Sequence, residues 1–186
     1  TDKSPLCIAQ VNTNMPRTHG DGFLHIKDVD FILPHDEPLL EIKGAVATEL
    51  TDRIGNYVAR LIQDGDTIQV GYGSLPNAIV SNLFAKRHLG VHTELLSDGL
   101  VNLIKAGVVD NSRKTINRGM TVAAFAMGTR ETYNFLHDNP AILFRTIDYT
   151  NDIRLISRQD NMVAINSALE IDLTGQATSE SIGNTF

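Results

Sequence analysis

The sequence predicts an α/β protein built on a doubly wound, mostly parallel sheet. Three consecutive segments, beginning at Thr67, Val91 and Thr121, each join a short strand pattern to a turn and then to an amphipathic helical pattern. Parallel strands joined by helices form right-handed crossovers, which pack the helices against the faces of the sheet. With 186 residues the chain can hold one domain and part of another, and we expect a fragment of a two-domain protein.

The composition is that of a soluble globular protein, with 42% hydrophobic and 20% charged residues. The net charge of −6 argues against broad electrostatic binding to nucleic acid or to an anionic membrane, and no apolar run is long enough to cross a bilayer. Cys7 is the single cysteine and cannot form a disulfide within the chain. We therefore expect a cytoplasmic protein without nucleic-acid or membrane partners.

The N-terminal part of the chain has a strand-rich pattern. Short strands are predicted over residues 6–11, 23–26 and 31–33, with a polar, turn-rich loop after the first. Proline and charged residues at 34–38 then break the pattern. We place a domain boundary near Lys43.

The remaining elements follow the alternation of an α/β domain. Apolar residues at helical spacing predict a helix over residues 46–62, and a strand follows at Thr67–Val70. Pro76 suits the first turn of the next helix, and Ser97 or Asp98 suits the cap of the one after it. The third unit has a strand at 121–127 and a helix that ends at 138–140. Further strands are predicted at 142–146, 153–156, 162–165 and 169–173.

Two loops that follow neighbouring strands are the best candidates for a functional site. The first, residues 71–77, reads GYGSLPN, and its glycines allow a ligand to approach the backbone closely. Open α/β sheets bind ligands at this edge. A glycine pair after a strand is also common in tight structural turns, and the dinucleotide fingerprint lacks its third glycine here. A nicotinamide cofactor is therefore disfavoured.

Glu94, in the second loop, is a carboxylate among apolar strand residues such as Val91 and Leu95. It is either an edge-strand residue paired with a lysine or arginine, or a nucleophile. The neighbouring glycine loop favours the second interpretation, because a nucleophile needs nearby donors for the charge that develops on a carbonyl oxygen. Glu170 and Glu180 fit this role less well, since neither follows a strand beside a glycine loop. The histidines show no ligand spacing, so we expect no metal site.

Five separated motifs resemble those of the acetyl-CoA hydrolase/transferase family, and in particular its 4-hydroxybutyrate and butyrate/acetate CoA-transferase branch. They are residues 10–21 (QVNTNMPRTHGD), 71–78 (GYGSLPNA), 90–99 (GVHTELLSDG), 127–129 (MGT), and 164–168 (AINSA) with 172–176 (DLTGQ). They occur in the family's order and extend over essentially the whole chain. The resemblance implies the α/β fold of CoA-transferases, with residues 1–43 as the tail of an N-terminal domain and residues 44–186 as the first part of the catalytic domain. It also implies a further glycine-rich segment after Phe186.

The same resemblance implies the reaction and its residues. CoA would pass from an acyl-CoA to a short carboxylic acid through a thioester on Glu94. Gln69 could donate a hydrogen bond to the reacting carbonyl, although its position also suits a side chain that faces solvent. CoA would be a substrate, with no permanently bound cofactor. The expected CoA-binding residues are Gly71, Tyr72, Gly73, Ser74, Leu75 and Ala168.

Two other functions remain open from the sequence. The same scaffold could hydrolyse acyl-CoA, with water as the final acceptor. A non-catalytic α/β module that binds a sugar phosphate or a nucleotide would have a similar pattern. The expected partners are acyl-CoA and short carboxylates, and we expect a homo-oligomer of undefined order.

Overall fold

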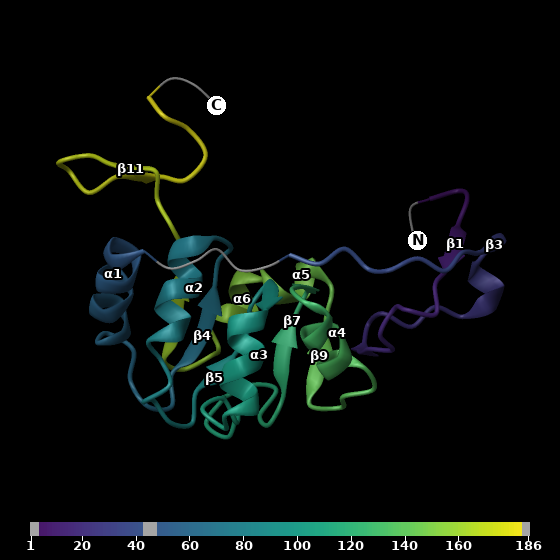
Figure 1. Ribbon diagram of the computed structural model, residues 1–186, viewed down its shortest axis with the longest axis horizontal. Coiled ribbons are helices and arrows are strands. Elements are labelled where there is room, and N and C mark those ends of the chain that lie inside the picture. Colours follow the sequence, from purple (N-terminus) through teal and green to yellow (C-terminus); the bar gives the residue numbers. More distant parts are fainter. Residues whose placement is uncertain (1–3, 43–47, 184–186) are drawn as a thin grey trace.

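The computed structural model describes residues 4–42 and 48–183, and most of them form an α/β body around a parallel sheet (Figure 1). Strand β4 (Thr67–Val70) lies between β10 (Met162–Ile165) and β5 (Gly90–Val91), and a second group has the order β2 (His19–Gly20), β9 (Ile142–Phe144), β7 (Thr121–Ala123). A parallel bridge from His92 to Val122 joins the two groups. The strand order is therefore β10-β4-β5-β7-β9-β2, which confirms the predicted mostly parallel α/β fold.

Two of these strands resume after a short interruption. Strand β6 (Leu95–Ser97) continues the path of β5, and β8 (Phe125–Met127) continues that of β7. Between them, the carbonyl oxygen of Glu94 accepts hydrogen bonds from the amides of Ala124 (2.9 Å) and Phe125 (3.0 Å). Two amides donate to one carbonyl because one strand carries an additional residue, as in a β-bulge, and such features redirect a side chain.

The helices lie on both faces of the sheet. Helices α2 (Ser74–Ser81), α3 (Asp98–Lys105) and α4 (Arg130–Leu136) connect successive strands and cover the face turned to the reader in Figure 1, beside α1 (Glu49–Ala59). From β4 to β9, successive strands are added towards one edge of the sheet. The chain then returns to the opposite edge, from β9 to β10, through the short helices α5 (Ile147–Thr150) and α6 (Ile153–Ile156). A right-handed crossover in the reverse direction places these two helices on the other face.

The hydrophobic core lies between the sheet and the helices α2, α3 and α4. Its fully buried side chains come from the strands (Ile68, Val91, Leu96) and from the helices and their ends (Leu83, Leu100). Burying side chains of this size contributes about 1.5–3 kcal/mol each. The core thus fixes the strand ends from which the candidate loops emerge.

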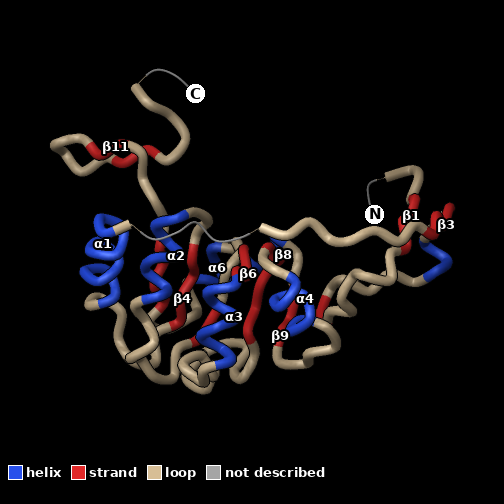
Figure 2. Tube along the Cα trace, viewed as in Figure 1, coloured by secondary structure: helices blue, strands red, loops and turns tan. Residues whose placement is uncertain are grey.

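The N-terminal segment leaves the body and returns to it. Strands β1 (Ile8–Val11) and β3 (Phe31–Pro34) form a parallel pair with the 3-10 helix η1 (Ile26–Asp28), away from the main sheet (Figures 1 and 2). The chain between them returns to the body, where β2 pairs with β9. Towards the C-terminus, a hairpin of β11 (Glu170–Ile171) and β12 (Ala177–Thr178) stands away from the body.

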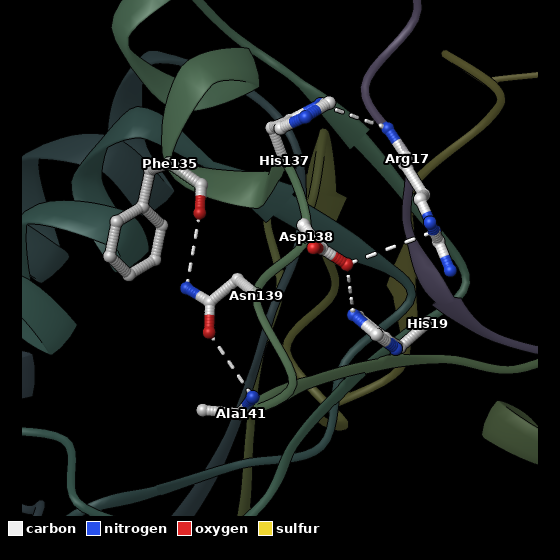
Figure 3. Close-up of polar contacts among 7 residues, drawn as sticks. All are labelled: Arg17, His19, Phe135, His137, Asp138, Asn139 and Ala141. Atoms are coloured by element: carbon white, nitrogen blue, oxygen red, sulfur yellow. Dashed lines mark hydrogen bonds and ion pairs between the residues drawn. The ribbon is translucent and has the colours of Figure 1, made fainter.

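A polar cluster attaches the returning segment to the loop after α4 (Figure 3). The Asp138 carboxylate lies 3.1 Å from Nε2 of His19 and 3.8 Å from Nε of Arg17, and the Asp138 amide donates to the carbonyl of Arg17 (2.7 Å). The Arg17 amide donates to Nδ1 of His137 (3.3 Å). Asp138 has a φ of +50°, a backbone conformation that aspartate and asparagine tolerate better than most residues.

Two predicted strands are wrong. Residues 153–156 form helix α6, because the Asp152 side chain accepts a hydrogen bond from the Arg154 amide and caps a helical turn. Residues 23–25 of the predicted strand 23–26 form an irregular stretch in which the side chains of Phe23 and Leu24 are exposed, and Ile26 begins η1. The helix predicted over 46–62 is shorter than expected and ends at Ala59. The predicted boundary at Lys43 falls outside the described residues.

Candidate active site

The two candidate loops lie side by side at the carboxyl edge of the sheet. Strands β4 and β5 pair in parallel, with Ile68 opposite Val91, so the chain leaves both strands at the same edge. Gly73, with a φ of +133°, forms the N-cap of α2. Residues with side chains rarely adopt this conformation, so the turn requires glycine here. Pro76 lies in the first turn of α2, as predicted.

Glu94 is half-buried at the interruption between β5 and β6. Its backbone carbonyl is fixed by the amides of Ala124 and Phe125, and its Oε2 accepts a hydrogen bond from Nδ2 of Asn151 (3.3 Å). The neighbouring Thr93 hydroxyl bridges the amide and the carbonyl of Val70, both at 3.2 Å. Within residues 4–42 and 48–183, no Lys, Arg or His side chain forms an ion pair with Glu94. Among the described side chains, the hydrogen-bond partner of the Glu94 carboxylate is therefore a neutral amide.

A cavity of about 300 Å³ brings Glu94 together with Gln69. Two further carboxamides line it, Asn151 from the α5–α6 junction and Asn166 from the end of β10. Gln69 and Asn166 exchange two hydrogen bonds, of 3.2 Å and 2.9 Å. The arrangement places a carboxylate beside amide donors, which suits the activation and binding of a carbonyl group.

The glycine loop lines a different cavity, of about 530 Å³, through Tyr72, Gly73 and Ser74. Leu95 contributes to this second cavity, whereas Glu94 contributes to the first. Successive residues of an extended chain point to opposite sides, which explains the separation. The structure thus brings Glu94 together with Gln69, and the glycine loop together with Leu95.

The other predicted CoA-binding residues have distinct environments. The Gly71 amide donates to the carbonyl of Ile165 (2.8 Å), so it is part of the sheet. Leu75 is partly buried and packs against the core. Ala168 is exposed on the segment between β10 and β11 and lines neither cavity.

His92 is a buried residue that lines the Glu94 cavity. Its side chain is 1% exposed, stacks on Tyr149 and donates through Nε2 to the carbonyl of Thr150 (2.9 Å). Burial lowers the pKa of His92, because a charged imidazolium would lose its hydration. A neutral His92 therefore anchors the turn that carries Asn151.

Sequence reasoning missed Asn151, Asn166 and His92. Their contacts depend on β10 lying beside β4 and on the α5–α6 turn, neither of which follows from local patterns. The one available signal was the position of Asn166, directly after a strand that ends at the same edge as Gln69. Among the described residues, no three His, Cys, Asp or Glu side chains gather as a metal site would require, and no helix has the length and hydropathy needed to span a membrane.

Comparisons with known proteins agree with this architecture. Residues 128–186 match the model of the acetyl-CoA hydrolase/transferase C-terminal domain. Over 98% of its length the chain is 44% identical to a 4-hydroxybutyrate coenzyme A transferase of Clostridium kluyveri and 45% identical to a succinyl-CoA:cyclohexane-1-carboxylate CoA transferase of Geobacter metallireducens. It covers 42% of each relative, so it spans about two fifths of their length.

Solved structures give the same result. RipA from Yersinia pestis superimposes with a TM-score of 0.89 at 45% identity, over 93% of this chain and 40% of that one. A 4-hydroxybutyrate CoA-transferase from Porphyromonas gingivalis superimposes with a TM-score of 0.90 at 39% identity, over 93% of this chain and 44% of that one. The chain belongs to the acetyl-CoA hydrolase/transferase family.

Proposed function

We propose that the protein transfers CoA between an acyl-CoA and a short carboxylic acid of the acetate, butyrate or 4-hydroxybutyrate type, with Glu94 as the nucleophile. The observation that carries the proposal is the cavity in which the Glu94 carboxylate and the Gln69 carboxamide lie together without a cationic partner for Glu94 among the described residues. Relatives named as CoA-transferases over nearly the whole chain support the same class of reaction.

The proposed reaction has four steps. A Glu94 oxygen attacks the thioester carbonyl carbon, the carbon–sulfur bond breaks, and CoA leaves as a thiolate while a mixed anhydride forms. The thiolate then attacks the glutamyl carbonyl carbon and releases the first carboxylate, which leaves CoA as a thioester on Glu94. The acceptor carboxylate attacks the carbonyl carbon of this thioester, the carbon–sulfur bond breaks, and CoA leaves again as a thiolate while a new anhydride forms. The thiolate finally attacks its acyl carbon, which gives the new acyl-CoA and restores Glu94.

The surrounding residues have separate tasks in this proposal. A Gln69 N–H binds the carbonyl oxygen on which negative charge develops, and the Asn151 amide orients the Glu94 carboxylate. The backbone of residues 71–75 and the small residue Ala168 line the path of CoA, which is a substrate and not a resident cofactor. A carboxylate is a weak nucleophile, so binding of the remote part of CoA supplies much of the barrier reduction.

We further propose that residues 1–43 are the tail of an N-terminal CoA-transferase domain and that residues 44–186 begin the catalytic domain. The separation of β1 and β3 from the main sheet supports this division, and β2 is where the proposed tail pairs with the body (Figure 1). Residues 128–186, which match a C-terminal domain model, fall within the proposed catalytic part.

The test is an exchange assay on the full-length protein with butyryl-CoA and isotope-labelled acetate. We expect labelled acetyl-CoA to form, and we expect Glu94→Gln to lower kcat by about 10⁴-fold, as the loss of a covalent nucleophile does. An acetyl-CoA hydrolase of Saccharomyces cerevisiae is 27% identical over 82% of this chain, so hydrolysis is the alternative reaction. Release of free CoA without labelled product would favour hydrolysis, and full activity of Glu94→Gln would refute the proposal.

A further inference from the structure

The Gln69 and Asn166 side chains form a reciprocal pair at the carboxyl edge of the sheet. Nε2 of Gln69 donates to Oδ1 of Asn166 (3.2 Å), and Nδ2 of Asn166 donates to Oε1 of Gln69 (2.9 Å). The two residues come from adjacent parallel strands, in which Gln69 lies opposite Ala164, two residues before Asn166. Both side chains line the cavity that contains Glu94.

Asn166 also meets the start of the glycine loop. A β-carbon added at Gly71 would lie 2.7 Å from Oδ1 of Asn166 and 3.3 Å from the carbonyl oxygen of Ile165. Both distances are shorter than ordinary van der Waals contact, so the Asn166 carboxamide fits against β4 only because residue 71 is glycine. One side chain thus contacts both Gln69 and the first residue of the loop.

The pairing decides which atoms Gln69 offers to the cavity. The last torsion of a glutamine side chain is broad and roughly two-fold, so an unpaired carboxamide could present either its oxygen or its nitrogen. A carboxamide has two N–H donors and one acceptor oxygen. The reciprocal pair uses one N–H and the oxygen of Gln69 and leaves the second N–H available.

We propose that Asn166 is a positioning residue that holds the Gln69 carboxamide so that its remaining N–H faces the reacting carbonyl oxygen at Glu94. The proposal rests on the CoA transfer proposed above and deepens it. Asn166 acts through Gln69 and does not itself bind the substrate. Its loss therefore affects the chemical step more than the binding of acyl-CoA.

The experiment is a double-mutant cycle in the full-length protein with Gln69→Ala, Asn166→Ala and both substitutions together, measured as kcat and KM for butyryl-CoA with acetate as acceptor. Asn166→Ala should lower kcat by about tenfold, the size of one lost hydrogen bond at a developing charge, with a nearly unchanged KM. The double variant should be no slower than Gln69→Ala, because Asn166 has no effect without its partner. Asn56→Ala, which removes an exposed asparagine side chain on α1, is the matched control and should keep the wild-type rate.

Other outcomes distinguish failure of the Asn166 positioning role from failure of the proposed CoA transfer. Additive losses in the double variant, or a raised KM at unchanged kcat, would overturn the positioning role while leaving CoA transfer intact. A wild-type protein that shows no exchange would refute the proposed function as well. Because Asn166 is exposed, its variants should fold, and Asn166→Ser provides a second small replacement with the same expected result.

A spectroscopic measurement tests the contact independently of activity. The side-chain Nε2 protons of Gln69, assigned by their loss in Gln69→Ala, should shift in ¹⁵N-edited NMR spectra of Asn166→Ala. Unchanged Gln69 side-chain signals would contradict the pairing itself.

Discussion

At Glu94, different partners hold the backbone and the side chain. The carbonyl is fixed by the amides of Ala124 and Phe125, whereas the carboxylate accepts a hydrogen bond from Asn151 alone among the described side chains. The backbone position of Glu94 is therefore set by the sheet, and the orientation of its carboxylate depends on one neutral donor. A substitution at Asn151 can therefore remove the hydrogen bond to the carboxylate without changing the backbone contacts of Glu94.

Replacing Asn151 with alanine should lower kcat for CoA transfer by about tenfold, because a hydrogen bond to a charged group contributes about 1.5–3 kcal/mol. The side chain is exposed, so the melting temperature should change little. Asn151→Asp replaces the amide donor with a second carboxylate, so it should lower kcat at least as far as Asn151→Ala does. Wild-type activity of Asn151→Asp would argue against contact between the two side chains.

Lys114 should make stability depend on pH. It is 3% exposed, donates to the carbonyls of Val91 (2.8 Å) and Met120 (2.7 Å), and burial lowers its pKa to about 7. In the unfolded chain a lysine has a pKa of about 10.4, so between these values the unfolded state binds more protons. The contribution of Lys114 to stability therefore rises with pH across this window, by at most about 1.4 kcal/mol per unit.

The measurement is urea unfolding at several pH values between 7 and 10 for wild type and for Lys114→Met. The methionine variant should be less stable near pH 10, since two buried carbonyls lose their donor, and its stability should rise less with pH. Equal slopes for the two proteins would show that Lys114 is charged in the folded state.

At the scale of elements, local patterns predicted most of the α/β units but not their contacts. The strands at Thr67 and Thr121 and the helices after them follow from hydrophobic periodicity, which reports local burial. Residues 153–156 were misassigned as a strand because four apolar-rich residues have no distinguishing period and the cap at Asp152 was overlooked. Gln69 and Glu94 could be named because each lies near a strand end, whereas Asn151 and Asn166 required the strand order.

Asp98 links two neighbouring helices rather than capping its own. The expected cap of α3 makes no side-chain hydrogen bond at Ser97, while Oδ1 of Asp98 accepts from the amide of Thr129 (2.9 Å) and from the hydroxyl of the buried Thr132. Asp98→Ala should lower the free energy of unfolding by about 1–3 kcal/mol, because the half-buried Thr129 amide and the buried Thr132 hydroxyl would lose their acceptor. Asp98→Asn keeps an acceptor oxygen and is the control in the same urea titration. Equal destabilisation by both substitutions would point to charge, not hydrogen bonding.

At the scale of the whole molecule, contacts distant in sequence decide how the N-terminal segment lies on the body. The pairing of β2 with β9 and the Asp138 cluster join residues more than 100 positions apart (Figure 3). No local pattern encodes such contacts, which is why the sequence predicted a loop at the residues where β2 pairs with β9. The apolar cavity of about 670 Å³ between residues 12–22, 37–40 and the ends of β7 to β9 depends on that attachment.

Asp138→Ala should loosen the returning segment, because it removes the carboxylate that His19 and Arg17 contact and places alanine at a positive φ. Hydrogen exchange of residues 12–22 should become faster, while the core strands remain protected. Asp138→Asn tolerates the same backbone conformation and separates loss of charge from backbone strain. Unchanged exchange in Asp138→Ala would mean that the β2–β9 pairing alone holds the segment.

The most direct test of the central claim is chemical trapping at Glu94. The full-length protein is incubated with butyryl-CoA, treated with hydroxylamine or borohydride, digested and analysed by mass spectrometry. We expect a hydroxamate or a reduced side chain on Glu94 and on no other carboxylate, and no modification when acyl-CoA is omitted. An unmodified Glu94 during normal turnover would contradict its role as the nucleophile.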